Sequence, residues 1–289
     1  MSTETIVGVF LPLSLAIIML GFGLGLTPED FKRVLKYPRS VFVGLFCQMV
    51  LLPLLAFTLC YVFHFSPELS IGLMILAASP GGVAANIFSH LSHGDVALNL
   101  TLTAINCVLA AFTVPLVVNL SIDHFGGSEA IGLQFKKTIE VFLIVLVPVV
   151  VGMLVRKTKP GLSAKADKPV RIFSILILAT ISVVAILKEK ERLMGSMGTV
   201  GLAMLVFNVG SMAIGYFMSL AFKLKHKEAT AITMEVGIHN ATLALYIAMT
   251  VLGSFELAIP AAIYSIFMFI TAGLFSAYLV RKNRQEFSA

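Results

Sequence analysis

Apolar residues in this chain gather into long runs that short polar or basic segments separate. A run of about 20 apolar residues is the length that an α-helix needs to cross the hydrocarbon of a bilayer. We expect nine such helices, at residues 5–26, 40–63, 69–91, 96–120, 134–155, 170–187, 195–222, 228–252 and 257–280. The predicted fold class is therefore an all-α polytopic membrane protein with nine transmembrane helices.

The composition agrees with this class and argues against a soluble enzyme. Hydrophobic residues make up 58% of the chain and charged residues 12%, which is too little charge to cover a soluble domain of 289 residues. The net charge of +6 does not indicate a nucleic-acid partner, because the basic residues lie between the apolar runs. Walker, G-x-S-x-G and H-E-x-x-H sequences are absent, so we predict no enzymatic activity, and no obligatory protein partner is evident.

Lys and Arg are unevenly divided between the two sets of expected loops. One set holds sixteen of them, and the other holds five, which are Lys136, Lys137, Lys188, Lys190 and Arg192. Loops rich in Lys and Arg face the cytoplasm, so we expect the N-terminus outside and the C-terminus inside. The expected location is the cell membrane, or the inner membrane of a bacterium, with the first run retained as a span and not removed as a signal peptide. The sixteen residues are Lys32, Arg33, Lys36, Arg39, Arg156, Lys157, Lys159, Lys165, Lys168, Arg171, Lys223, Lys225, Lys227, Arg281, Lys282 and Arg284.

The expected span 228–252 carries Glu235, His239 and Asn240 inside an otherwise apolar run. Glu235 would lie roughly 12 Å along the helix from Lys227, which marks the polar end. An ionised carboxylate at that depth costs about 3 kcal/mol unless it has a partner or faces water. No Lys or Arg falls in the apolar part of another expected span, so a small cation is the expected partner. A glutamate that stays protonated is the alternative.

A break in the helix is expected beside this glutamate. Gly237 loosens the turn, and the side chain of Asn240 can cap a new helix start. The break would place the carbonyls of Glu235 and Val236 next to the carboxylate. Oxygen donors of this kind suit a hard cation such as Na⁺.

The expected span 69–91 contains a second interruption, Ala78-Ser-Pro-Gly-Gly-Val-Ala-Ala-Asn86. Pro80 has no N–H to donate, and the two glycines that follow let the chain unwind. The interrupted spans are the third and the eighth, so they cross the membrane in opposite directions. This arrangement is typical of an inverted-topology repeat in which two broken helices cross at mid-membrane and direct their N-termini at an anionic substrate. Alternatively, Pro and Gly in single transmembrane helices only kink them.

Further oxygen donors lie on two other spans. Asn99, Thr103 and Asn106 recur at i, i+4 and i+7, so they share one helix face, and Gln48 is a single amide in an apolar run. Facing the breaks, these side chains would bind the same ion as Glu235. The alternative is hydrogen bonding between helices, which contributes about 0.6–2 kcal/mol for each bond.

Four segments resemble the bile acid:sodium symporter family, in the bacterial-type form with nine helices that lacks the first. They are Leu20–Phe31, Pro80–Asn86, His93–Leu98 and Glu235–Asn240. The resemblance implies a single transporter domain, 1–289, that couples sodium to uptake of an organic anion such as a bile acid or a smaller carboxylate, by alternating access. It also implies a panel domain at about 1–36 and 130–190 (spans 1, 5 and 6). A core domain would comprise about 37–129 and 191–289 (spans 2–4 and 7–9).

The resemblance further implies two sodium sites and a substrate site. The first sodium site would use Asn86, Asn99, Thr103 and Glu235. The second would use Gln48, Glu235 and His239 with the carbonyls of Val236 and Ile238. The substrate would contact Gly82, Val83 and Asn240.

The chain departs from the family pattern at three of these positions. Ala85 and Asn99 stand where serine is common, and His239 stands where glutamine is common. The histidine argues against the second sodium site, because an imidazole nitrogen is a poor Na⁺ ligand. Two alternatives to a sodium symporter follow: a proton-coupled organic anion carrier that uses Glu235, and a membrane receptor or scaffold that transports nothing.

Overall fold

The structure, a computed structural model, describes residues 8–9, 11–126, 135–188 and 197–287. These residues form helices and short 3₁₀ or π turns (labelled η), as the predicted all-α class requires, and their one β-type pairing is an isolated bridge. The elements are α2 (Leu11–Gly25), α3 (Pro28–Lys32), η2 (Arg33–Leu35), α4 (Pro38–Phe46), η3 (Cys47–Leu51), α5 (Leu52–Val62), α6 (Pro67–Ala78), α7 (Val83–Leu91), α8 (Val96–Phe125), α9 (Phe135–Thr158), α10 (Pro160–Lys188), α12 (Met197–Ala221), α13 (His226–Gly237), α14 (Ala241–Tyr246), η4 (Ile247–Val251), η5 (Glu256–Ala258) and α15 (Ile259–Phe287).

Five of the described helices are long and apolar enough to cross a membrane, or six if one bent pair counts as a single span. The bent pair is α2 with the segment Pro28–Leu35, which turn by 74°. The expected third and eighth spans are each divided into two shorter helices, α6 and α7, and α13 and α14. The prediction of nine spans thus stays a prediction. The five helices are Pro38–Val62, Val96–Phe125, Ile139–Thr158, Gly198–Ala221 and Glu256–Arg281.

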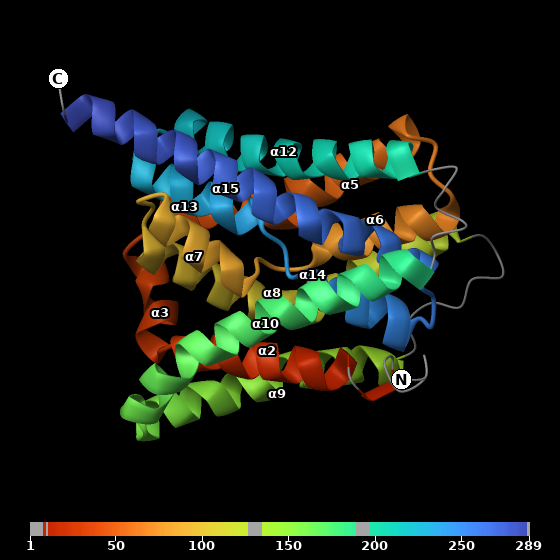
Figure 1. Cartoon of the computed structure of the whole chain (residues 1–289), viewed down its shortest axis with the longest axis horizontal. Helices are drawn as coiled ribbons and strands as arrows, with labels where there is room; N and C mark the ends of the chain where they lie inside the picture. Colours follow the sequence, from red (N-terminus) through yellow and green to blue (C-terminus); the bar gives the residue numbers. More distant parts are fainter. Residues whose placement is uncertain (1–7, 10, 127–134, 189–196, 288–289) are drawn as a thin grey trace.

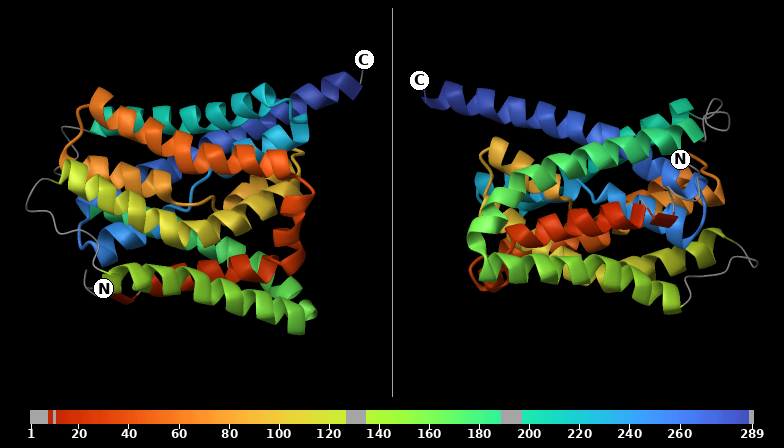
Figure 2. Two further views of the ribbon diagram at one scale, coloured as in Figure 1. Left: turned by 180° about the vertical axis from the view of Figure 1, so that it is seen from behind. Right: turned by 60° about the horizontal axis from the view of Figure 1, so that its bottom comes forward.

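Several helices extend beyond the apolar runs that predicted them, α10 and α15 the furthest. α10 begins at Pro160 instead of residue 170, because proline is accepted in a first turn, where its missing N–H is not needed. α15 continues to Phe287 instead of residue 280 and runs past the ends of its neighbours (Figures 1 and 2). Hydropathy marks the part of a helix that suits lipid and says little about its polar ends.

The helices α2, α9 and α10 pack against one another, with α2 and α9 side by side along one edge of the molecule (Figure 1). Glycines permit this close packing. A Cβ added at Gly152 would lie 2.7 Å from the carbonyl carbon of Gly23, so the two backbones touch at this point. α12 lies along the opposite edge, α15 runs obliquely from that edge towards the middle of the molecule, and the broken helices lie between the two edges (Figure 1).

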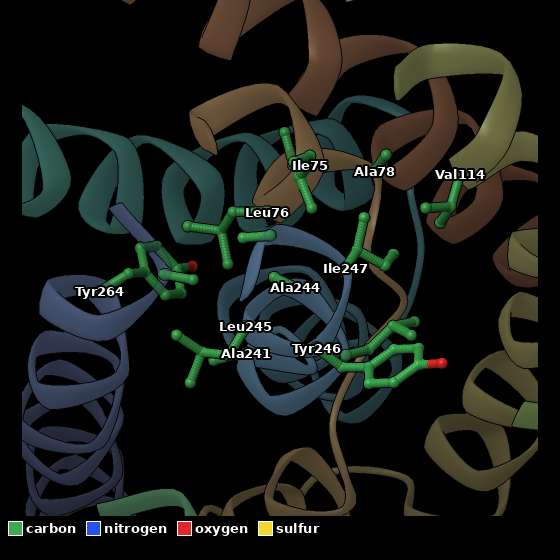
Figure 3. Close-up of a cluster of buried hydrophobic side chains, with 14 of the residues drawn as sticks. Ile75, Leu76, Ala78, Val114, Ala241, Ala244, Leu245, Tyr246, Ile247 and Tyr264 are labelled. Atoms are coloured by element: carbon green, nitrogen blue, oxygen red, sulfur yellow. The ribbon is translucent and has the colours of Figure 1, made fainter. Parts of the chain in front are cut away.

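The short helix α14 lies at the centre of the bundle (Figure 3). All six of its residues are buried, and their side chains are apolar except for Thr242 and the hydroxyl of Tyr246. α14 packs against α2, α6 and α15, and a helix with neighbours on several sides is a core helix. The labelled members of this cluster are Ile75, Leu76, Ala78, Val114, Ala241, Ala244, Leu245, Tyr246, Ile247 and Tyr264.

Candidate functional site

The two breaks in the helices lie against each other and pair through their backbones. The amide of Gly82 donates to the carbonyl of Ile238 at 2.7 Å, and the amide of Asn240 donates to the carbonyl of Pro80 at 2.8 Å. Gly81 and His239 form the isolated antiparallel bridge. Each break thus satisfies polar backbone groups that the other would otherwise leave unpaired inside the bundle. The links between α6 and α7 and between α13 and α14 are seen crossing in Figure 1.

The sequence signals for these breaks act as expected. α6 ends at Ala78, directly before Ser79 and Pro80, and α7 begins again after Gly82. α13 ends at Gly237, and Asn240 caps the next helix, since its Oδ1 accepts a hydrogen bond from the amide of Leu243 at 3.1 Å. The helix breaks expected in the segment Ala78–Asn86 and beside Gly237 are therefore present in the structure.

Glu235 lies two residues before the end of α13 and is fully buried. Thr103 donates to its Oε2 at 2.6 Å, and Asn106 donates to its Oε1 at 3.0 Å. The carboxylate also fills the space above Gly81, where any Cβ would overlap it. The ion pairs among the described residues are Arg33–Asp30 and Lys137–Glu140, so Glu235 has no basic partner among them.

Of the residues expected at a first sodium site, Thr103 contacts this carboxylate, and Asn86 and Asn99 lie next to Thr103 and to the helix that carries Glu235. Asn86 belongs to α7, and its Nδ2 lies 3.5 Å from the Thr103 hydroxyl. Asn99, one turn before Thr103 on α8, donates its Nδ2 to the carbonyl of Ala231 at 2.8 Å. The oxygens Asn86 Oδ1 and Asn99 Oδ1 are both buried and accept no hydrogen bond from the described residues.

The residues expected at a second site are anchored to different helices. Gln48, in the π turn η3, donates its Nε2 to the carbonyls of Ser79 at 2.9 Å and Ala77 at 3.3 Å, both at the end of α6. His239 contacts Tyr264 of α15 through Nδ1 at 2.9 Å. Val236 lies in the last turn of α13, and the Ile238 carbonyl already accepts from the crossing. No hydrogen bond between Gln48 and His239 is found among the described residues.

A cavity of about 10 Å³ lies beside Gln48, which is about the smallest space that can hold one water molecule. Its walls include the two amides Gln48 and Asn106, and Pro80 of the first break. Gln48 Oε1 and Asn106 Oδ1 are buried and unpartnered among the described residues. Room for one small ligand therefore exists next to oxygens that have no donor.

The three residues expected to contact substrate all lie at the crossing. Gly82 is buried and pairs with Ile238, Val83 begins α7 and is partly buried, and Asn240 is 6% exposed. Asn240 Nδ2 lies 4.0 Å from the sulfur of Met19 on α2. The crossing therefore contacts the group of helices formed by α2, α9 and α10.

Unpartnered buried acceptors concentrate in this region. Leaving such a group without a partner costs about 1–3 kcal/mol. Four of these atoms are amide oxygens, which can bind a hard cation but cannot bond to an anion, since both are acceptors. Of the described residues, the buried side-chain atoms without a partner are Gln48 Oε1, Asn86 Oδ1, Ser89 Oγ, Asn99 Oδ1, Asn106 Oδ1 and His239 Nε2.

Sequence reasoning left several residues of this region unassigned. Asn106 was recognised on the polar face with Asn99 and Thr103, but its bond to Glu235 was not. Tyr264 and Asn208 both donate to the carbonyl of Gly237, at 2.8 and 2.9 Å. A lone asparagine in an apolar run is a signal that would have pointed to Asn208. A tyrosine among other aromatic residues gives no such signal.

Comparison with known proteins places the chain among transporters. Residues 12–196 match the Sodium Bile acid symporter family. An uncharacterized sodium-dependent transporter of Bacillus subtilis (strain 168) is 26% identical over 99% of this chain and 87% of its own length. A probable sodium/metabolite cotransporter of rice chloroplasts (Oryza sativa subsp. japonica) is 27% identical over 90% of this chain and 64% of its own. The hepatic sodium/bile acid cotransporter of Rattus norvegicus is 26% identical over 84% of this chain and 67% of its own.

The family match covers more than half of the chain and agrees with the resemblance found in the sequence. It also agrees with the several apolar helices of the fold, which indicate a multi-pass membrane protein. We conclude that the chain belongs to the sodium bile acid symporter family, a family of sodium-coupled transporters and not of enzymes.

Proposed function

We propose that the protein is a symporter that uses the entry of Na⁺ to drive uptake of an organic anion by alternating access. The observation that carries this proposal is the buried Glu235 carboxylate, which has no basic partner among the described residues and is bonded to Thr103 and to Asn106, whose Oδ1 has no donor among them. A cation at this point would offset both the charge and the unsatisfied acceptors. The relatives whose names specify sodium support the choice of ion.

We assign the co-transported ions to two neighbouring positions. Asn86, Asn99, Thr103 and Glu235 would hold the first. The second would use Glu235 with a set on the other side of the crossing. That set comprises Gln48, His239 and the carbonyls of Val236 and Ile238.

The anion would bind at Gly82, Val83 and Asn240. Both α7 and α14 begin at the crossing, and the N-terminus of a helix favours negative charge. Cations next to this point would strengthen the attraction and couple the two ligands. The name of the rat relative supports a bile acid, and that of the rice relative supports a smaller metabolite, so both kinds of anion are candidates.

Alternating access would move a core domain, 37–129 and 191–289, against a panel domain, 1–36 and 130–190. The contacts across this division include α8 with α9 and α10 with α15, and near the crossing Asn240 with Met19 and the hydroxyl of Tyr246, which donates to Glu140 at 3.1 Å. We place the nine spans with the N-terminus outside and the C-terminus in the cytoplasm, as an inverted repeat of which the two broken helices are equivalent members.

The test is a ligand screen of the purified protein by thermal unfolding, with NaCl against choline chloride, over bile acids and small carboxylates. We expect Na⁺ to raise the midpoint, and the transported anion to raise it further only with Na⁺. Glu235→Gln should abolish both effects and uptake into proteoliposomes, whereas Glu68→Gln, which neutralises an exposed carboxylate, should preserve them. If uptake does not depend on Na⁺ and the protein releases protons when substrate binds, the protein is a proton-coupled carrier and the proposal is wrong.

A further inference from the structure

His239 is held on two sides by aromatic rings inside the bundle. The ring of Tyr264 meets it edge to face with centroids 5.2 Å apart, and the ring of Phe207 lies 5.7 Å away. The histidine is 1% exposed, so water does not decide which nitrogen carries the proton. The neighbouring hydrogen-bonding groups decide it instead.

Nδ1 of His239 lies 2.9 Å from the hydroxyl oxygen of Tyr264. The same hydroxyl lies 2.8 Å from the carbonyl oxygen of Gly237. A hydroxyl has one proton and can donate it once. If the proton pointed at His239, two oxygens would face each other at 2.8 Å with no hydrogen between them. The hydroxyl therefore donates to Gly237 and accepts from His239.

It follows that His239 carries its proton on Nδ1 and a lone pair on Nε2. Nε2 is buried without a partner among the described residues. With the proton on Nδ1, the unsatisfied group at Nε2 is an acceptor, which a cation can satisfy. With the proton on Nε2, it would be a donor, which a cation cannot satisfy.

A chain of hydrogen bonds fixes the orientation of Tyr264. The Gly237 carbonyl can only accept, so the Asn208 atom that lies 2.9 Å from it is Nδ2. Asn208 Oδ1 then faces the hydroxyl of Thr271 of α15, which also lies 2.9 Å from the carbonyl of Phe267. The Gly237 carbonyl thus accepts from Asn208 and Tyr264 together. This carbonyl ends α13, two residues beyond Glu235. The orientation of the His239 ring is therefore tied to the helix that carries the carboxylate.

We propose that Tyr264 is a positioning residue for cation binding. Its hydroxyl oxygen accepts a hydrogen bond from Nδ1–H of His239, which leaves Nε2 as a nitrogen ligand for the second co-transported cation. The inference rests on the proposed function and goes beyond it, because it explains how an imidazole does the work of the amide oxygen common at this position in the family. The opposite tautomer would turn an N–H dipole toward the cation and repel it. The ring binds a cation only while Tyr264 holds the proton on the far nitrogen.

The first test reads the tautomer directly. The full chain is labelled with ¹⁵N-histidine, and long-range ¹H–¹⁵N correlations are recorded with and without NaCl. The chain has six histidines, so the His239 signals are identified by their loss in His239→Gln. We expect a protonated Nδ1, an unprotonated Nε2, and a shift of Nε2 alone when Na⁺ is added. A protonated Nε2 in the wild type, or a Na⁺ response that leaves Nε2 unchanged, would overturn the proposal.

The second test uses Tyr264→Phe, which removes the acceptor of the Nδ1 proton. Since one hydrogen bond contributes about 1 kcal/mol, we expect sodium affinity, read from thermal stabilisation, to fall roughly 5- to 10-fold. Tyr216→Phe, which removes a hydroxyl outside this chain of bonds, should leave affinity unchanged. The same Tyr264→Phe change in a His239→Gln background should cost less than twofold, because an amide has no tautomer to fix. An equal loss in both backgrounds would show that Tyr264 acts only on packing.

The two hypotheses fail in different ways. A wild-type protein with the assigned tautomer and no stabilisation by Na⁺ would overturn the proposed sodium coupling and the ligand role of His239 with it. Stabilisation by Na⁺ without a response of Nε2 would overturn the role of Tyr264 and leave sodium coupling in place. If Tyr264→Phe does not fold, the wild-type spectra alone decide between these outcomes.

Discussion

Replacing Gly81 with alanine tests whether the crossing holds the Glu235 carboxylate in place. The added Cβ would overlap Oε1 and the carboxyl carbon of Glu235 and lie 2.6 Å from Oε2. Gly81 cannot retreat, because its break is paired with the other through the bonds of Gly82 and Asn240. The carboxylate, which is the end of a flexible side chain, is therefore the group that must move.

The structure sets the size of the effect. Moving the carboxylate stretches the bonds from Thr103, at 2.6 Å, and Asn106, at 3.0 Å. Breaking both outright would cost about 3–6 kcal/mol, since a hydrogen bond to a charged group contributes about 1.5–3 kcal/mol. A side chain that shifts without losing both partners costs less, and overpacking typically costs about 1–3 kcal/mol. We expect Gly81→Ala to lower the free energy of unfolding by about 1–3 kcal/mol and sodium affinity at least tenfold.

The assay is thermal unfolding in detergent over a range of NaCl concentrations. Gly273→Ala is the matched control, because a Cβ at Gly273 of α15 has no atom within 4 Å and should leave the sodium response unchanged. The reasoning also requires that Gly81→Ala destabilise much less in a Glu235→Ala background, where the obstructing carboxylate is gone. Equal destabilisation in both backgrounds would refute it.

Four further outcomes follow from the same geometry. Asn106→Ala should weaken sodium binding about tenfold in a thermal titration, because Glu235 Oε1 loses its donor. Asn240→Ala should lower the free energy of unfolding by about 1 kcal/mol in denaturant titrations, and Asn240→Ser should preserve most of it, since serine also caps a helix and adds no buried charge. Cysteines at Ser2 and Ala289 should react with impermeant reagents from opposite sides of the membrane. Two Na⁺ that enter with one monoanion carry one net positive charge, which the membrane potential drives by about 2.3 kcal/mol per 100 mV. Substrate should therefore induce a current on a solid-supported membrane, and undiminished uptake without current would exclude that stoichiometry.

The positions of the breaks were predictable because they depend on local chemistry. Pro80 cannot donate to the preceding turn, and Asn240 supplies a cap, so each signal acts within a few residues. The pairing of Gly81 with His239 was not predictable in the same detail. Its register depends on how two helices distant in sequence pack, and no local pattern encodes that.

The candidate site was predictable only in part, for a related reason. Helical spacing placed Asn99, Thr103 and Asn106 on one face, but could not say which of them would reach Glu235. Tyr264 was missed because its role depends on a neighbour from another helix. The π turn η3, which carries Gln48, was also missed, although Pro53, two residues after its end, removes a backbone donor and favours irregular helix.

At the crossing, the backbone groups and the side chains have different roles. The backbone groups of the two breaks bond to each other, through Gly82 with Ile238 and Asn240 with Pro80, so they can hold the fold without a ligand. The side-chain oxygens around Glu235 have no such partners among the described residues. An unsatisfied buried acceptor lowers the stability of the ion-free protein, and a bound cation removes this cost. The stability regained in this way adds to the free energy of cation binding. Substitutions of these side chains should therefore change ion affinity more than folding, whereas substitutions that disturb the paired backbone should change both.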